Sequence, residues 1–201
     1  MADKLARAQL ARAANALKVQ SGSALPALVL MTDDERLADP LAAARTLPRG
    51  SMVILRARDA ARRARLAEEL QRVTRAKGIK LLIADDPALA MRIGADGIHL
   101  PQARARSAAH WRALRPSWII TAAARSPAAT HIPAADAILL SPVFATKSHP
   151  GGKVLGSLRM RLIARDARLP IYALGGIDRF SVRAVAGARL AGIAAIGALA
   201  A

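Results

Sequence analysis

The stretch Ser141 to Gly156, SPVFATKSHPGGKVLG, gathers side chains that suit the binding of an anion. Thr146, Lys147, Ser148 and His149 supply two hydroxyls, an ammonium and an imidazole in succession. The proline and glycines that follow let the backbone turn tightly and approach a ligand closely. Because the stretch follows the apolar run AILL, we expect it to be the loop after a buried strand. A solvated surface loop without a ligand is the alternative.

The elements that would position this loop alternate between short apolar runs and helical segments. Strands are expected at residues 25–31, 52–55, 79–83, 96–100, 118–122, 137–140, 170–174 and 192–196. Helices are expected at residues 3–18, 41–47, 58–77, 87–93, 106–114, 127–132, 158–167 and 179–186. Such alternation is typical of a parallel sheet with crossover helices. Eight units in 201 residues predict an α/β protein with a (β/α)8 TIM barrel. An open doubly wound sheet would usually need fewer strands and a glycine-rich first turn.

The first helical segment is amphipathic and precedes the first predicted strand. Ala6, Leu10, Ala13 and Leu17 share one face, and basic residues lie opposite. We expect this helix, residues 1–20, to cover the core of a single barrel domain at residues 21–201. Lying on a membrane surface is the alternative. Little sequence follows the last strand, so the last helix should be short or missing. The first helix, or a partner chain in a homodimer, would then cover that flank.

Composition narrows the class of protein. The chain is 53% apolar and carries 31 basic against 14 acidic residues, a formal charge of +17. Such charge favours phosphates, on nucleic acids or on small metabolites. Two Trp, two Phe and one Tyr offer little for stacking on bases, and no helix-turn-helix is visible, so nucleic acid is disfavoured as a partner. With no cysteine, no membrane-length apolar run and no signal-peptide core, we expect a cytoplasmic protein without a membrane partner.

A barrel of this kind places its site at the carboxyl ends of the strands. The candidates are therefore the polar or glycine residues that follow each apolar run. They are Thr32, Asp33, Arg56, Arg58, Asp85, His99, Gln102, Arg125, the loop from Ser141, Gly175, Gly176 and Gly197. We expect an anion at the last three, because glycines leave backbone donors uncovered. The competing location for an anion is the arginine-rich helix from Arg58 to Arg75.

Four motifs carry a family resemblance. They are GADGIHLPQ at 94–102, SPVFATKSHPGG at 141–152, IYALGGI at 171–177 and AGIAAIGAL at 191–199. In this order and spacing, from about residue 25 onward, the chain resembles the thiamine phosphate synthase and TenI family. The resemblance implies a TIM barrel of thiamine biosynthesis. Its reaction joins hydroxymethylpyrimidine pyrophosphate to thiazole phosphate with release of pyrophosphate, or, in the TenI branch, isomerises a thiazole carboxylate precursor.

The resemblance also implies roles for individual residues. Arg56, Arg58, Lys147 and His149 would be the catalytic residues, and Asp85 would be one ligand of a magnesium ion. Cations of this kind stabilise a departing pyrophosphate. The substrate-binding and phosphate-binding residues would be Thr146, Ser148, Gly175, Gly176, Gly197, Gln102 and Arg104. The implied partners are small phosphorylated metabolites, namely thiazole phosphate, the pyrophosphate ester and thiamine phosphate.

The chain departs from the family pattern mainly in the half that would hold pyrophosphate. The residues that replace the expected polar ones are Ile54, Ala84, Arg104, Ala123, His149, Gly197 and, for the tautomerase histidine, Arg125. Arg104 stands where a second metal carboxylate is expected. We therefore expect Arg104 to pair with Asp85 and to stand in for magnesium. These departures keep two alternatives open: a TenI-like tautomerase, and a barrel that binds a phosphorylated ligand without turnover.

Three of the candidates also have purely structural explanations. His99 lies between Ile98 and Leu100, and is expected to be a hydrogen-bonded core histidine that matters more for stability than for ligand affinity. Arg58 could belong to the solvated face of a basic helix. Asp85, which is followed by Asp86 and Pro87, could cap the next helix.

Overall fold

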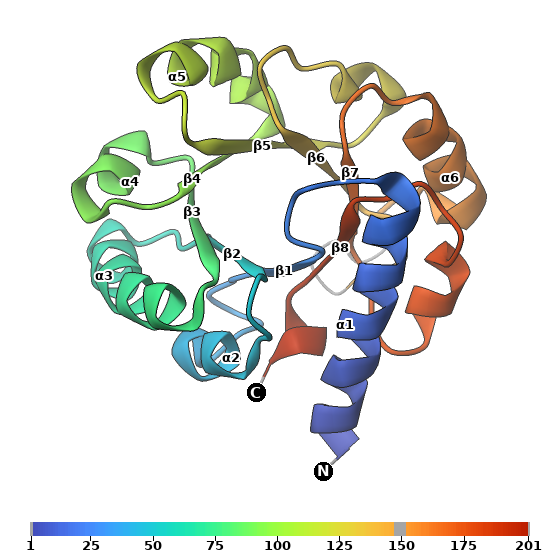
Figure 1. Ribbon diagram of the computed structural model, residues 1–201, viewed down its shortest axis with the longest axis horizontal. Coiled ribbons are helices and arrows are strands. Elements are labelled where there is room, and N and C mark those ends of the chain that lie inside the picture. The colour runs from blue at the N-terminus through green and yellow to red at the C-terminus, as the bar shows by residue number, and fades with distance from the viewer. Residues whose placement is uncertain (1, 147–151, 201) are drawn as a thin grey trace.

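The computed structural model describes residues 2–146 and 152–200, and its sheet is a closed parallel barrel (Figure 1). The eight strands follow one another around the barrel in chain order, and β8 pairs with β1. The strands are β1 (Leu28–Met31), β2 (Met52–Leu55), β3 (Lys80–Ala84), β4 (Gly97–Leu100), β5 (Ile119–Ala124), β6 (Ala137–Leu140), β7 (Ile171–Leu174) and β8 (Gly192–Ala195). The predicted TIM barrel is confirmed.

Helices surround the barrel on its outside (Figure 1). The α-helices are α1 (Ala2–Ser21), α2 (Pro40–Thr46), α3 (Ala60–Lys77), α4 (Pro87–Ile93), α5 (Ala108–Leu114) and α6 (Gly156–Asp166). The 3-10 helices are η1 (Gln102–Ser107), η2 (Pro127–Thr130), η3 (Ser181–Val185) and η4 (Gly197–Leu199). Two segments predicted as helices, 127–132 and 179–186, form the shorter 3-10 helices η2 and η3. At η3 the Asp178 carboxylate accepts the N–H groups of Phe180 and Ser181, each at 2.8 Å, which fixes a tight turn.

The bounds of α3 and α4 follow from capping residues. The Asp59 carboxylate accepts the Arg62 N–H at 2.6 Å, so α3 begins after Asp59 rather than at Arg58. Gly78, with φ 63°, ends the same helix in the left-handed conformation. The Asp86 carboxylate accepts the Leu89 N–H at 3.0 Å and starts α4. Asp85 therefore does not cap this helix, and its role must be sought elsewhere.

Helix α1 packs along the barrel where β8 meets β1 (Figure 1). Leu10, Ala14 and Leu17 on its inner face are fully or almost fully buried. Arg7 Nη1 donates to the carbonyl oxygen of Ala200 at 2.7 Å, which ties α1 to the segment after β8. In the described part of that segment the helix is the short η4. The extra N-terminal helix and the short last helix agree with the prediction, and α1 covers this flank.

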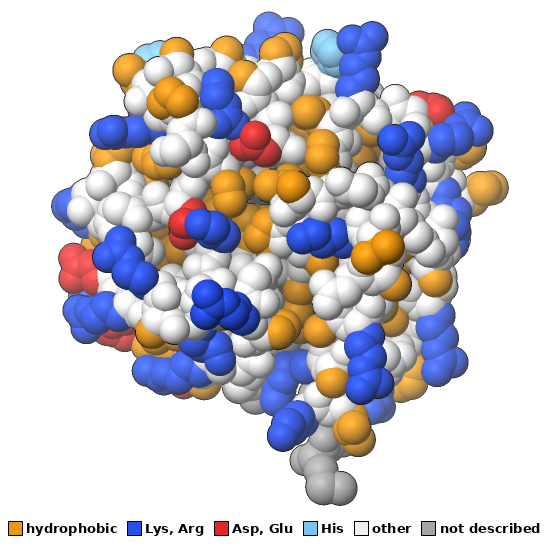
Figure 2. Space-filling model, in the orientation of Figure 1, with side chains coloured by type: hydrophobic (Ala, Val, Ile, Leu, Met, Phe, Trp, Pro, Cys, Tyr) orange, Lys and Arg blue, Asp and Glu red, His pale blue; other side chains and the backbone are white. Residues whose placement is uncertain are grey.

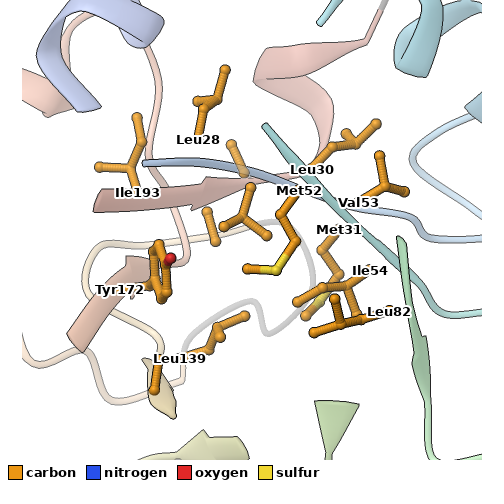
Figure 3. Packing of buried hydrophobic residues seen from close by; sticks show 14 of the residues in the cluster. Leu28, Leu30, Met31, Met52, Val53, Ile54, Leu82, Leu139, Tyr172 and Ile193 are labelled. Atoms are coloured by element: carbon orange, nitrogen blue, oxygen red, sulfur yellow. The ribbon is translucent and has the colours of Figure 1, made fainter. Parts of the chain in front are cut away.

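Large side chains fill the barrel itself. Figure 3 shows Met31, Met52 and Tyr172 pointing toward the barrel centre, while Val53 points away from it. The Tyr172 hydroxyl donates to the carbonyl oxygen of Pro26 at 2.6 Å, so this polar tip is satisfied inside an apolar core. Because these side chains occupy the interior, the barrel is a packed core that supports a site at the strand ends.

The outer surface is strongly basic. Figure 2 shows Lys and Arg side chains spread around the edge of one face, with hydrophobic side chains near its centre. Within residues 2–146 and 152–200, no helix is both long and apolar enough to cross a lipid bilayer.

Candidate functional site

Arg56 is fixed at the end of β2 by the residues that follow β1. Its backbone N–H donates to Thr32 Oγ1 at 2.8 Å, and the Thr32 hydroxyl donates to the Arg56 carbonyl oxygen at 3.0 Å. Its guanidinium pairs with the Asp33 carboxylate. This reciprocal contact joins the two neighbouring strand ends and leaves the Arg56 side chain half exposed there.

Asp33 binds two arginines at once. Arg36 contacts both carboxylate oxygens, with Nη2 at 2.9 Å from Oδ2 and Nε at 3.1 Å from Oδ1. Together Arg36 and Arg56 hold the pKa of Asp33 well below its usual range, although its partial burial opposes them. Asp33 is therefore ionised at neutral pH, and it compensates part of the positive charge of Arg56.

Arg58 lies between the same two loops but is held more loosely. Its backbone N–H donates to Asp34 Oδ2 at 2.8 Å, while its guanidinium lies 3.3 Å from Glu35 Oε1. The two paired side chains are 87% and 73% exposed, so this ion pair contributes at most about 1 kcal/mol. A ligand could therefore recruit Arg58 away from Glu35 with little loss of stability.

Asp85 and Arg104 meet across the ends of β3 and β4. Arg104 Nη1 lies 3.0 Å from Asp85 Oδ1, as the sequence predicted for this pair. The Asp85 backbone has φ 56°, a left-handed conformation that is uncommon outside glycine, although aspartate adopts it more readily than most residues. Strained residues of this type cluster at functional sites. Since Asp86 caps α4, helix capping does not account for Asp85.

The residues around Asp85 do not fit a divalent metal ion. Asp86, the neighbouring carboxylate, accepts Arg63 Nη2 at 2.9 Å and Arg63 Nε at 3.1 Å through the oxygen that does not cap α4. Among the described residues, no group of three or more His, Asp or Glu side chains could hold a metal. Magnesium prefers carboxylate and water oxygens, whereas Arg104 places a guanidinium against Asp85.

Other predicted binding residues lie along the same rim. Gln102 begins η1, and its Oε1 accepts the backbone N–H of Arg125 at 3.1 Å, which links the loops after β4 and β5. Thr146 is partly buried in the loop after β6. The remaining predicted residues of that loop, Lys147, Ser148 and His149, lie outside the described residues.

Gly175 and Gly176 support the loop after β6. Both have positive φ, at 95° and 65°. A Cβ on Gly175 would lie 2.8 Å from the Pro142 Cα, and one on Gly176 would lie 2.4 Å from the carbonyl oxygen of Ala145. Packing of this loop, rather than room for a ligand, therefore explains why neither glycine carries a side chain. The pair sets the position of the backbone just before Thr146.

Gly197 differs from the glycine pair. A Cβ at this position would meet nothing within 4 Å, and Gly197 is exposed at the end of β8. Within the described part of the chain, the backbone N–H groups of Gly176 and Gly197 donate hydrogen bonds to no other residue. Uncovered N–H groups at the ends of neighbouring strands are suited to an anion. Gly197 is thus the predicted residue that best fits a phosphate.

His99 lies inside the barrel, one residue before the end of β4. It is 6% exposed, and its Nδ1 lies 2.9 Å from Thr121 Oγ1. Burial, with a smaller contribution from the positive charge of Arg56, lowers the pKa of His99 from 6.5 to about 4. The imidazole is therefore neutral at physiological pH. These contacts match the prediction of a hydrogen-bonded core histidine.

A basic hollow on the outside of the barrel competes with the mouth for anions. It lies between α2 and α3 and has a volume of about 360 Å³. Arg45, Arg65 and Arg72 line it, but Glu68 and Glu69 do so as well. The two carboxylates oppose an anion there, so the mouth remains the better candidate.

Together, the fold and these strand-end residues define a (β/α)8-barrel protein with a candidate site at its mouth. The family model described as thiamine monophosphate synthase matches residues 28–199. The chain belongs to this family.

Individual relatives agree with the family match. A member of the thiamine-phosphate synthase group from Aquifex aeolicus is 32% identical over 161 residues, which cover 76% of this chain and 86% of that protein. The thiamine-phosphate synthase of Methanoregula boonei is 32% identical over 139 residues, covering 67% of this chain but 64% of that protein. Thiamine phosphate pyrophosphorylase from Pyrococcus furiosus superimposes with a TM-score of 0.69 at 23% identity, over 91% of this chain and 87% of that one. This last likeness concerns the fold.

Sequence reasoning named Asp33 as a candidate but missed that it and the next two carboxylates pair with arginines. Asp33, Asp34 and Glu35 lie in the loop after β1, and each pairs with an arginine that follows β2 or lies in the first turn of α3. The run TDDE after an apolar strand was the available signal, since adjacent strand ends meet at the barrel mouth. The pairing with Arg56, Arg58 and Arg62 could have been predicted from that adjacency.

Proposed function

We propose that this chain joins hydroxymethylpyrimidine pyrophosphate to thiazole phosphate and releases pyrophosphate. The observation that carries the proposal is the open edge at Gly197 beside Gly176, in a chain that matches the family over residues 28–199. The N–H groups of both glycines have no acceptor within the described residues, and the space beside Gly197 is open. A phosphate anchored at this edge would hold the thiazole ring over the barrel mouth.

The reaction balances without an oxidant or a reductant. The bond from the methylene carbon to the pyrophosphate oxygen breaks, and its electron pair leaves with pyrophosphate. The ring nitrogen of the thiazole then donates its lone pair to that carbon, which forms the new bond. Positive groups near the leaving oxygen favour the first step. We assign this role to Arg56 and Arg58, which follow β2, and to Lys147 and His149.

A second candidate function is the binding of a phosphorylated ligand without turnover. The observation that favours it is the pairing of Arg56, Arg58 and Arg104 with Asp33, Glu35 and Asp85. These carboxylates reduce the positive potential available to a departing pyrophosphate. The anchor at Gly197 would remain intact in such a protein. A TenI-like tautomerase has less support, because Arg125 stands at the position of the expected histidine.

Substitutions at Gly197 test the phosphate anchor. Because a side chain fits there without a clash, Gly197→Asp should leave stability within about 1 kcal/mol of the unmodified protein. Its carboxylate should weaken thiazole phosphate binding by at least about tenfold through like-charge repulsion. Gly197→Ser adds a hydroxyl donor and should keep or improve the affinity. Isothermal titration calorimetry with thiazole phosphate measures both effects.

Gly22→Asp is the control for net charge, since Gly22 also has open space around it but lies in the loop before β1. Its φ of 68° makes a side chain strained there, so affinities are compared per folded protein. The substitution makes the same change in net charge away from the mouth and should not alter the affinity. Equal losses for Gly22→Asp and Gly197→Asp would show that the anion responds to net charge alone. That result would move the ligand to the basic outer surface, such as the hollow beside α3.

A further inference from the structure

We propose that the Arg104 guanidinium takes the place of a divalent cation, so that this chain binds pyrophosphate without magnesium. The inference rests on the proposed function, in which pyrophosphate is the released product. It starts from the geometry at Asp85, where Arg104 Nη1 lies 3.0 Å from Oδ1. A positive group already contacts one carboxylate oxygen of Asp85, and its charge opposes the binding of a second cation beside it.

The neighbouring carboxylate is also unavailable to a metal. Asp86 Oδ1 accepts the Leu89 N–H at 3.0 Å, and Oδ2 accepts Arg63 Nη2 at 2.9 Å. A magnesium ion bound through Asp86 would compete with the cap of α4 or with the pair to Arg63. We therefore infer that Arg104, and not a metal ion, is the positive group that faces Asp85.

Arg104 keeps the capacity to bind an anion while it is paired. A guanidinium carries five N–H donors in a planar fork, and the contact with Asp85 uses one terminal nitrogen. The Arg104 side chain is 64% exposed, so the other donors face solvent. Its backbone is fixed, because its N–H donates to the Pro101 carbonyl oxygen at 2.9 Å and its carbonyl accepts the Ser107 hydroxyl at 2.8 Å.

Pyrophosphate suits this arrangement. Phosphate oxygens match the spacing of guanidinium donors and accept two parallel hydrogen bonds. Asp85 would act as a positioning residue that holds the guanidinium over the strand end. Arg56 and Arg58, at the neighbouring end of β2, would supply further cations once released from their carboxylates.

Calorimetric titration of sodium pyrophosphate tests the proposal, with the unmodified protein in EDTA and in millimolar magnesium. We expect affinity in EDTA to be within about threefold of that in magnesium, or tighter. In EDTA, Arg104→Asp should bind pyrophosphate at least about tenfold more weakly, because a charge-assisted hydrogen bond to the ligand is lost. Magnesium should restore part of the affinity of Arg104→Asp, because the new carboxylate and Asp85 would face each other and could bind the ion together.

Arg106→Asp is the matched control, because Arg106 is exposed on the same helix and gives the same charge change. It should weaken binding less than Arg104→Asp and show no magnesium response. A strong magnesium requirement in the unmodified protein, or equal behaviour of the two variants, would overturn the proposal. Thiazole phosphate titrated into the same samples separates the causes. If thiazole phosphate binds but pyrophosphate binds only with magnesium, the inference about Arg104 is rejected and the proposed function stands. If neither compound binds, both the inference and the proposed function are rejected.

Discussion

Replacing Gly176 with alanine is expected to lower the free energy of unfolding by about 3 kcal/mol. The added Cβ would lie 2.4 Å from the carbonyl oxygen of Ala145 and 2.7 Å from the Phe144 Cβ. The backbone at Gly176 also has φ 65°, which an alanine adopts at a cost of about 1 to 2 kcal/mol. For a domain of this size the change corresponds to a fall in Tm of about 6 to 12 °C.

The control for this prediction is Gly197→Ala, which adds the same methyl group in open space. Its unfolding free energy should stay within about 0.5 kcal/mol of the unmodified protein. Urea denaturation of the three proteins measures the difference. If the two variants proved equally stable, Gly176 would not hold the loop after β6 by close packing. Because the clash lies just before Thr146, Gly176→Ala should also weaken thiazole phosphate binding in the fraction that remains folded.

The second large effect is a loss of stability in mild acid that depends on His99. The folded protein keeps this imidazole neutral down to about pH 4, because burial lowers its pKa from 6.5. The unfolded chain takes up the proton near pH 6.5, so unfolding becomes more favourable as the pH falls between these values. Over this window the linkage amounts to about 3 kcal/mol. Below about pH 4 both states are protonated and the loss stops.

His99→Gln isolates this contribution. Glutamine does not titrate, and its amide can reach the Thr121 hydroxyl that His99 contacts at 2.9 Å. The unmodified protein should lose about 3 kcal/mol more than the variant when urea denaturation is compared at pH 7 and pH 4. His110→Gln, at an exposed position of α5, controls for the loss of an imidazole. If the unmodified protein and His99→Gln lost the same free energy of unfolding between pH 7 and pH 4, the pKa of His99 would not be lowered in the folded state. The carboxylates of Asp33 and Asp178 have lowered pKa values, so their contribution to the free energy of unfolding is lost only at lower pH.

The barrel could be predicted from the sequence because each strand is a short apolar run followed by polar residues. β2 and β6 have the predicted bounds, and the runs at β3 and β5 are shifted by one or two residues. The helices predicted at 127–132 and 179–186 form, but as shorter 3-10 helices. In η3 the carboxylate of Asp178 fixes the backbone turn, and hydrophobic periodicity does not report such a local contact.

The site was harder to predict, because side-chain pairing depends on which loops meet. The contact between Arg104 and Asp85 could be anticipated, since both follow neighbouring strands. The contact of Arg36 and Arg56 with the Asp33 carboxylate was not predicted, although Asp33 and Arg56 were both candidate residues. The reason given for the glycine pair was also incomplete. Their missing side chains make room for the loop after β6, and only Gly197 faces open space.

The most direct test of the proposed function is a turnover measurement. The purified protein is mixed with hydroxymethylpyrimidine pyrophosphate and thiazole phosphate, in EDTA and in magnesium, and thiamine phosphate and pyrophosphate are quantified by chromatography. We expect both products in equal amounts, formed in EDTA as well as in magnesium, and lost in Gly197→Asp purified in the same way. If thiazole phosphate binds but less than one equivalent of thiamine phosphate forms per protein under either condition, the synthase function is contradicted and the chain is a phosphorylated-ligand-binding barrel.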